Sequence, residues 1–97
     1  MFRKEETNPD DAKAWFNKGV ELSKLRNYEE AIKCYDRAIE INPDDEDAWC
    51  NKGYALINLG RSEDALIALD KAIEINPNKE PAWVNRGLAL INLGRYG

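Results

Sequence analysis

The residue types that most often perform catalysis are scarce in this chain of 97 residues. It has no histidine, and Cys34 and Cys50 do not form a Cys-x-x-Cys pair, so a zinc site would lack ligands. The acidic pairs Glu29-Glu30 and Asp44-Asp45 are typical of helix starts and solvated surface. The sequence contains no candidate nucleophile–base pair, metal-binding set or phosphate loop. We therefore predict that this chain alone is not an enzyme, with no catalytic, cofactor-binding or metal-binding residues.

The net charge of the chain limits the kinds of partner that it can bind. Fourteen basic and eighteen acidic residues give a net charge of −4 and a pI near 4.8. We therefore expect neither nucleic acid nor an acidic membrane surface as a partner. No apolar run approaches the length of a membrane span, and the first residues lack the apolar segment of a signal peptide. We interpret the two cysteines as small buried hydrophobic residues in a reducing compartment, which predicts a cytoplasmic location.

The most informative pattern is a repeat with a period of 34 residues, marked by Trp15, Trp49 and Trp83. An alanine precedes each tryptophan, and an asparagine, a base and a glycine follow it at fixed distances. These recurring residues are Ala14, Asn17, Lys18 and Gly19; Ala48, Asn51, Lys52 and Gly53; and Ala82, Asn85, Arg86 and Gly87. Each block opens with Asn-Pro, at 8–9, 42–43 and 76–77. Such a period indicates a repeat architecture, in which each unit buries its apolar face by stacking on a neighbour.

Two helical stretches in each full block position these residues. Apolar residues at helical spacing predict five helices, near 11–25, 28–41, 45–59, 62–75 and 79–93. Proline cannot continue a helix, so the Asn-Pro pairs end the second helix of each block. Because the intervening loops are short, successive helices must lie antiparallel as hairpins.

Three glycines fall in the middle of predicted helices, at Gly19, Gly53 and Gly87. Glycine there costs about 1 kcal/mol relative to alanine. A cost repeated at one position of the period implies a steric requirement. We expect this requirement to be the close approach of the two helix backbones within each hairpin.

The repeated pattern resembles the tetratricopeptide repeat, a helix–turn–helix unit of 34 residues. The matching positions are Trp15, Gly19, Leu22, Ala31, Tyr35, Ala38 and Pro43 in the first block, and Trp49, Gly53, Leu56, Ala65, Leu69, Ala72 and Pro77 in the second. The resemblance covers nearly the whole chain. It implies an all-α fold, an α-solenoid of five helices in antiparallel hairpins that form a right-handed superhelical stack. It divides a single domain, 1–97, into repeats at 8–41 and 42–75 and a partial repeat at 76–97.

One position departs from the family pattern in every block. The residue before the glycine is usually leucine, whereas this chain has Lys18, Lys52 and Arg86. We expect their methylene stems to cover apolar surface while their charges reach water. The departure therefore does not change the predicted fold.

The resemblance also implies a binding surface. In tetratricopeptide stacks the first helices of successive repeats line a concave groove. The corresponding positions here are Phe16, Asn17, Val20, Cys50, Asn51, Tyr54, Ile57, Val84, Asn85, Leu88 and Ile91. This largely apolar set predicts binding of an apolar helix or extended peptide. The alternative is that some of these side chains fold down onto neighbouring helices.

Two narrower functions of the family can be compared with these positions. The row Asn17, Asn51 and Asn85 resembles the asparagine ladder that holds peptide main chain in O-GlcNAc transferases, although asparagine is common at this place in the family. Co-chaperone domains clamp a terminal carboxylate with two lysines, two asparagines and an arginine. The corresponding residues here are Phe16, Val20, Asn51, Pro81 and Asn85, of which only Asn51 matches. Because no cation is present, we do not expect this chain to clamp chaperone tails.

The third block stops where its second helix should begin, so we expect the chain to be a window from a longer array. The alternative is an array closed by one solitary helix that acts as a cap. Trp83, Leu90 and Leu93 would meet that missing helix. The leading prediction is a non-catalytic module that binds a protein or peptide in its apolar groove. The alternative is a self-assembling structural array, a dimer or helix-swapped homo-oligomer joined through the unfinished third repeat. A third interpretation is the recognition arm of an enzyme whose catalytic domain lies outside the chain.

Overall fold

The computed structural model describes residues 11–94, so the predicted start of the first repeat at 8–9 lies outside the described range. The described residues form five α-helices, which are α1 (Ala12–Lys24), α2 (Tyr28–Ile41), α3 (Glu46–Asn58), α4 (Ser62–Ile75) and α5 (Glu80–Asn92). Every helix end lies within one residue of the range that the sequence predicts. The predicted all-α fold of stacked hairpins is confirmed.

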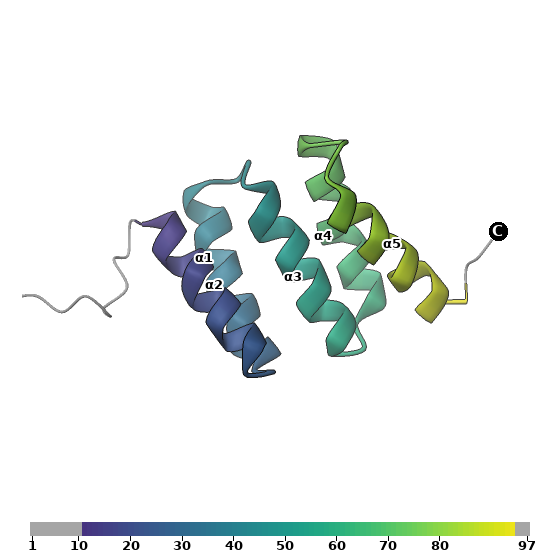
Figure 1. The fold of residues 1–97 in the computed structure, drawn as a ribbon, viewed down its shortest axis with the longest axis horizontal. Coiled ribbons are helices and arrows are strands. Elements are labelled where there is room, and N and C mark those ends of the chain that lie inside the picture. The colour runs from purple at the N-terminus through teal and green to yellow at the C-terminus, as the bar shows by residue number, and fades with distance from the viewer. Residues whose placement is uncertain (1–10, 95–97) are drawn as a thin grey trace, which may run out of the picture.

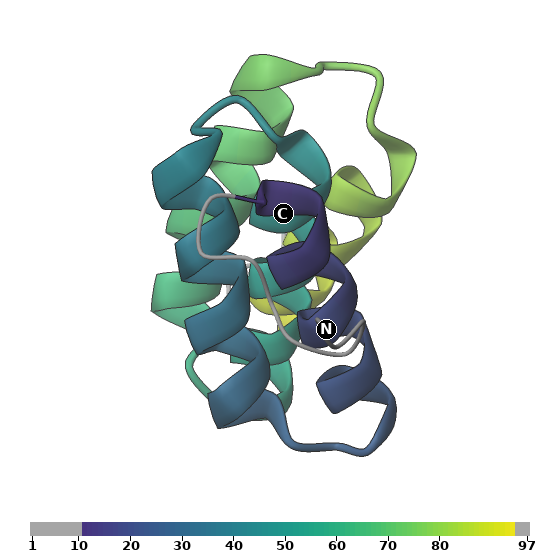
Figure 2. The same cartoon turned by 90° about the vertical axis from the view of Figure 1, so that its left-hand side faces the viewer.

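The helices are arranged in two layers. Helices α1 and α2 form one antiparallel hairpin and α3 and α4 the next, and the hairpins stack side by side (Figure 1). Viewed from the side, α1, α3 and α5 make up one layer, and α2 and α4 make up the other (Figure 2). Helix α5 packs on α4 and on α3. Within residues 11–94, α5 has no hairpin partner of its own.

Local sequence fixes where the helices begin and end. Asp11 and Asp45 precede α1 and α3, and each carboxylate accepts a hydrogen bond of 3.1 Å from the backbone N–H three residues ahead. This is the N-cap arrangement that satisfies a free donor at a helix start. After α3, Gly60 adopts φ +77°, in the left-handed region that favours glycine. Arg26 takes the same place after α1 at φ +63°, a conformation that a side chain makes costly.

The mid-helix glycines make room for a side chain of the facing helix, which corrects the expected approach of two backbones. A Cβ atom on Gly19 would lie 2.5 Å from Cε1 of Tyr35 in α2. A Cβ atom on Gly53 would lie 2.5 Å from Cγ of Leu69 in α4. A third such neighbour is absent among the described residues, since a Cβ on Gly87 would meet nothing within 4 Å. The glycine thus creates a notch that one large side chain of the second helix fills.

Small residues dominate the interior, and Tyr35 and Leu69 are the largest fully buried side chains of the described chain. The main cluster joins α3, α4 and α5 and contains Cys50, Leu56, Ile57, Ala65, Ala68, Leu69, Ala72, Ala82 and Ala89. The two tryptophans of the later blocks tie each first helix to the start of its own block. The indole Nε1 of Trp49 donates to the carbonyl of Pro43 at 2.8 Å, and that of Trp83 donates to the carbonyl of Pro77 at 2.7 Å.

Candidate functional site

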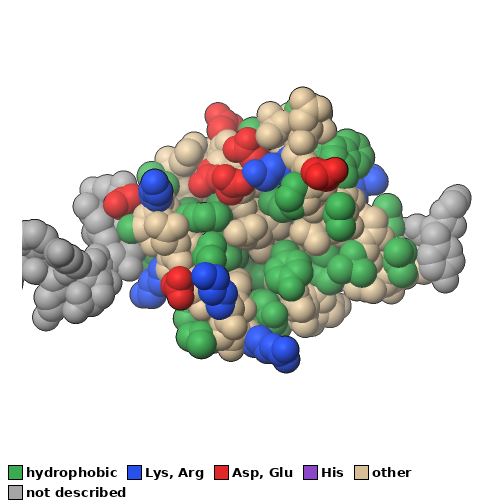
Figure 3. Space-filling model, in the orientation of Figure 1, with side chains coloured by type: hydrophobic (Ala, Val, Ile, Leu, Met, Phe, Trp, Pro, Cys, Tyr) green, Lys and Arg blue, Asp and Glu red, His purple; other side chains and the backbone are tan. Residues whose placement is uncertain are grey.

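The layer made by α1, α3 and α5 faces the viewer in Figure 1, and we call its outer surface the groove face. Hydrophobic side chains gather over the middle of this face (Figure 3). Among the predicted groove residues, those exposed are Asn17, Tyr54, Val84, Leu88 and Ile91. Those half-buried are Phe16, Val20, Asn51 and Asn85. The apolar surface is most exposed on α5, where Val84 is 65% exposed and Ile91 is 56% exposed.

Two predicted groove residues are not on the surface. Cys50 is 3% exposed, and Ile57 is also buried. Both belong to the cluster that includes Ala82 and Ala89 of α5, so packing of α5 on α3 covers them. Their assignment to the ligand-contacting surface is therefore corrected. The burial predicted for both cysteines is confirmed, since Cys34 and Cys50 are free and buried.

Aromatic contacts hold parts of the groove face in place. The Tyr54 ring meets Tyr28, at the start of α2, edge to face with centroids 6.4 Å apart. The Phe16 ring lies 5.9 Å from the ring of Tyr35. Tyr54 remains exposed despite its contact. It therefore presents an aromatic side chain whose position is already restricted, which lowers the entropy lost on binding.

Two of the repeated amides already have partners inside the protein. The Tyr35 hydroxyl lies 3.1 Å from the Ser23 hydroxyl. Burial raises the pKa of Tyr35, and hydrogen bonds from Ser23 and Asn51 oppose that rise. Burial likewise raises the pKa of Cys50, opposed by the charge of Lys79 and by a hydrogen bond with Asn85. These amides link each first helix to the preceding repeat.

The bases that replace the family's leucine join successive hairpins. Lys52 Nζ lies 2.7 Å from an Asp36 carboxylate oxygen, and Arg86 Nε lies 2.7 Å from one of Asp70. The Lys52 ammonium also lies 5.5 Å from the centroid of the Trp49 ring, a cation–π contact. Reasoning from the sequence missed these ion pairs. The detectable signal was the recurrence of an aspartate at 36 and 70 with the same period as the bases.

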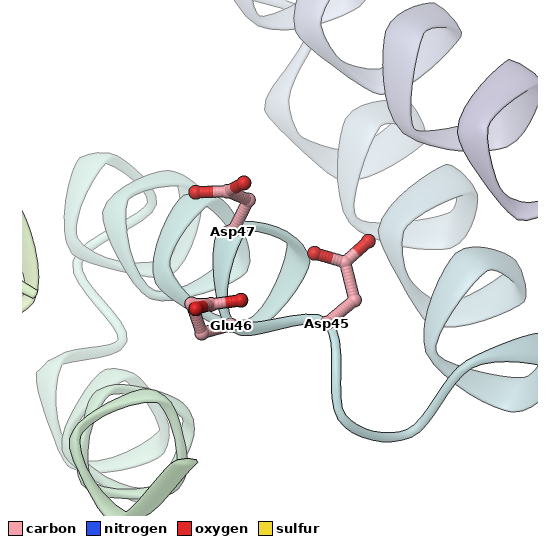
Figure 4. Close-up of side chains that lie close together, drawn as sticks. All are labelled: Asp45, Glu46 and Asp47. Atoms are coloured by element: carbon pink, nitrogen blue, oxygen red, sulfur yellow. The ribbon is translucent and has the colours of Figure 1, made fainter. Parts of the chain in front are cut away.

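Three acidic side chains gather at the start of α3, where Asp45, Glu46 and Asp47 place carboxylate oxygens within 4.8 Å of one another (Figure 4). Each carboxylate has a partner in the chain. Asp45 caps α3, Glu46 accepts a hydrogen bond of 3.2 Å from Asn76, and Asp47 pairs with Lys79. The last two contacts connect the start of α3 to the loop before α5. We therefore interpret this cluster as a capping and joining element.

The residues predicted for self-association lie on α5 and just after it. Trp83 is 48% exposed, and Leu90 and Leu93 are half-buried. Gly87 lies between them in sequence, and its notch is open. The surface that receives Tyr35 or Leu69 in the two hairpins is therefore uncovered on α5. Across residues 11–94, no helix combines the length and the apolar character needed to cross a bilayer.

The fold and the groove face together define an α-solenoid of helical hairpins, a class of repeat protein that offers one layer of helices to partners. Models of the tetratricopeptide repeat match residues 12–45, 34–67 and 68–97. The chain therefore belongs to the tetratricopeptide repeat family, whose domains typically serve as non-catalytic protein–protein interaction modules. No curated protein sequence matches this chain significantly.

Solved structures agree with this assignment. The TPR domain of Arabidopsis OM64 superposes with a TM-score of 0.86 at 27% identity, over 88% of this chain and 70% of that one. The MamA protein gives 0.87 at 27% identity, over 91% of this chain and 48% of that one. The TPR2AB domain of yeast Sti1, in complex with pHSP90, gives 0.84 at 29% identity, over 90% of this chain and 34% of that one. This chain thus spans about half of MamA and a third of the Sti1 chain.

Proposed function

We propose that this chain is a protein-interaction module whose groove face binds a largely apolar peptide or helix. The observation that carries the proposal is the exposure of Tyr54, Val84, Leu88 and Ile91 on the neighbouring helices α3 and α5. Contiguous exposed apolar surface usually marks an interaction site. Family membership supports the proposal, and the Sti1 domain, solved with pHSP90, is one similar structure that holds a protein partner.

The ligand differs in chemistry from a peptide that is recognised through its terminal carboxylate. The clamp positions carry Phe16, Val20, Asn51, Pro81 and Asn85, which supply no cation for a charge-assisted hydrogen bond. Asn51 and Asn85 also engage Tyr35 and Cys50 of the preceding repeat. Recognition of the ligand therefore depends on apolar contacts with Tyr54 and with α5.

Substitution of Tyr54 tests this proposal. Peptides selected from a random display library on the intact chain are measured by fluorescence anisotropy. We expect Tyr54→Ala to raise the Kd about tenfold or more, because buried tyrosines often dominate interfaces, while thermal melting stays nearly unchanged. The control is Ile67→Ala, since Ile67 is also a large exposed hydrophobic residue but lies on α4 in the other layer. Failure to select any peptide, or equal effects of the two substitutions, would count against the groove face.

Self-association through α5 is a second candidate function. The uncovered side of α5 favours it, because Trp83 is half-exposed beside the open notch of Gly87. Light scattering over a hundredfold concentration range should then show mass rising above 11.1 kDa. Leu93→Glu should restore the monomer if this side of α5 is responsible, whereas Leu88→Glu should do so if the groove face is. A constant monomer mass would reject the candidate.

A further inference from the structure

A cleft of about 760 Å³ lies where α1 and α3 begin. Its lining includes two large apolar side chains, Phe16 of α1 and Ile41 at the end of α2, and we call it the N-terminal cleft. The remaining lining residues are Asp11, Ala12, Lys13, Asn42, Asp44, Asp45, Glu46 and Asp47. Phe16 also belongs to the groove face, so the cleft continues that surface toward the loop between α2 and α3. Figure 3 shows acidic side chains gathered at this edge of the molecule.

The two junctions between repeats are built differently. We call the contact of α1 and α2 with α3 the first junction, and the contact of α3 and α4 with α5 the second junction. Helix α3 packs closely on α5, with Cys50 buried between them, whereas α1 and α3 contact each other much less. One period earlier than Cys50 the chain has Phe16, whose larger ring lies against Tyr35 of α2 and lines the cleft. The second junction also has the hydrogen bond from Asn76 to Glu46. The first junction cannot form its equivalent, because Ala12 occupies the place of Glu46.

The negative charge of the cleft favours a ligand with a positive charge. Among the described residues that line the cleft are five carboxylates and Lys13, and the pair that Asp47 forms with Lys79 neutralises one carboxylate, which leaves an excess of three negative charges among these residues. Lys13 is exposed and forms no ion pair with another described residue. An acidic ligand would be repelled, and it could not use the helix starts, since Asp11 and Asp45 already cap them.

The second junction shows which group these carboxylates accept. There the chain supplies a cation of its own, because the Lys79 ammonium binds Asp47, and its side chain is 22% exposed. That hydrogen bond raises the pKa of Lys79. In the first junction the residues one period earlier than Asn78 and Lys79 are Asp44 and Asp45. The residue one period earlier than Asp47 is Lys13, so the first junction has its lysine at the place of the acceptor and two added carboxylates, Asp44 and Asp45, in place of Asn78 and Lys79.

We propose that the N-terminal cleft binds a lysine or arginine of the peptide ligand, together with an adjacent apolar side chain that packs on Phe16 and Ile41. This inference rests on the proposed function and specifies its ligand, a segment in which a basic residue is flanked by apolar ones. The remainder of that segment extends along the groove face toward Tyr54. The charge of the cleft fixes the orientation in which the peptide binds to the otherwise apolar groove face. The basic residue of the peptide lies at the end near the starts of α1 and α3.

The test is an NMR titration of the intact chain with three peptides that differ at one residue. They are acetyl-Ala-Leu-Lys-Leu-Ala-amide and its counterparts with glutamine or glutamate in place of lysine. We expect the lysine peptide to shift the backbone amide signals of residues 42–47 and to bind at least threefold more tightly than the glutamate peptide. Because charges near the surface are screened, that ratio should fall toward one as the salt concentration rises.

Variants at the two junctions test whether the preference for the lysine peptide arises in the N-terminal cleft. Asp44→Asn introduces the residue found one period later, and we expect it to weaken binding of the lysine peptide about two- to threefold while leaving the glutamine peptide unchanged. Ile41→Ala should weaken both peptides. Asn78→Asp makes the reverse exchange at the other junction and should change neither.

Three outcomes would overturn the inference. The first is equal binding of the three peptides, and the second is a shift confined to α5. Signals from Tyr54 and Leu88 that respond to all three peptides would leave the proposed function intact while rejecting the cleft. The third is a shift of residues 42–47 caused by Arg3→Gln with Lys4→Gln in the absence of peptide, because a basic side chain of this chain would then be the occupant.

Discussion

The hairpin α3–α4 and the single helix α5 carry the same sequence pattern in different surroundings. In the hairpin, Leu69 fills the notch at Gly53, and Trp49 is half-buried. On α5 the equivalent notch at Gly87 is open, and Trp83 is 48% exposed. The repeat signature therefore marks where a second helix packs. It does not bury those residues by itself.

This difference separates stability from binding along the chain. The fully buried side chains lie in the hairpins and at their junctions, and half of the large exposed hydrophobic side chains of the described residues lie on α5, namely Trp83, Val84, Leu88 and Ile91. A helix with fewer packed neighbours opens at a lower free energy than the core. We therefore expect α5 to be both the main apolar contact surface and the first described helix to open.

Filling the two notches should produce the largest difference. A leucine at Gly53 would overlap Leu69, so we expect Gly53→Leu to destabilise the protein by about 3 kcal/mol. A Cβ at Gly87 meets nothing within 4 Å, so Gly87→Leu should cost less than about 1 kcal/mol. Chemical denaturation of both variants measures the contrast. Similar losses at the two positions would show that the Gly87 notch is filled in solution.

The reaction rates of the two cysteine thiols measure how readily each region of the structure opens. Cys34 lies within the first hairpin, whereas Cys50 is covered by α5. If α5 opens by itself, Cys50 should react with a thiol reagent about tenfold faster than Cys34. Single Cys→Ala variants assign the two rates, and equal rates would mean that α5 opens only with the whole domain.

Both thiols also predict how stability changes with pH. Burial is the main cause that raises their pKa values in the folded protein. The unfolded thiols therefore ionise first as the pH rises. Hence the free energy of unfolding should fall from about pH 8.5, the ordinary value, up to the raised folded values. Replacing both cysteines with alanine should remove the part of this decrease that they cause.

Replacing Gly53 and Gly87 with alanine should change stability less than replacing them with leucine. The two alanine substitutions should change it in opposite directions. Gly87→Ala improves helix propensity without a clash and should stabilise the protein by about 0.5–1 kcal/mol. Gly53→Ala places its Cβ against Leu69 and should destabilise it. Thermal melting of the pair gives both signs directly. A loss of stability at Gly87 would contradict the open notch.

The ion pairs between hairpins should have the smallest effect. Double-mutant cycles on Lys52–Asp36 and on Arg86–Asp70 should each give about 0.2–1 kcal/mol, since both pairs are partly exposed. The Arg86–Asp70 pair joins α5 to α4, so Asp70→Asn should speed hydrogen exchange in α5 more than elsewhere. Asp36→Asn should not show that selectivity. Identical exchange patterns would indicate that α5 does not open independently.

The sequence predicts the fold closely because its signals are local. Helical spacing, the Asn-Pro pairs and the capping aspartates act within a few residues, and each predicted helix matches its observed range to within one residue. The glycines show the limit of local reasoning. Their period reveals a steric requirement, but only the facing helix shows that Tyr35 and Leu69 meet it with side chains.

The groove was less predictable because exposure depends on the next repeat. Phe16, Cys50 and Val84 occupy one position of the period, yet they are half-buried, buried and exposed in turn. Cys50 is covered because α5 follows, and Val84 is exposed because none of the described residues covers it. The repeat boundaries, the superhelical handedness, the ligand and the cytoplasmic location stay predictions.

The pairs Lys52–Asp36 and Arg86–Asp70 recur with the period of the chain. Each hairpin consequently presents to its successor the same charge that it met on its predecessor. A tandem copy of residues 42–75, inserted after Ile75, would repeat this ion pair at both new seams, since Lys52 of the copy would meet Asp70 and Asp70 of the copy would meet Arg86. The repeated ion pair is therefore compatible with a larger number of repeats. The molecule can be extended in whole units once Asp45 of the copy, which would stand opposite Asp47 where Lys79 now does, is exchanged for lysine. The span of ligand that it covers would increase with each added unit.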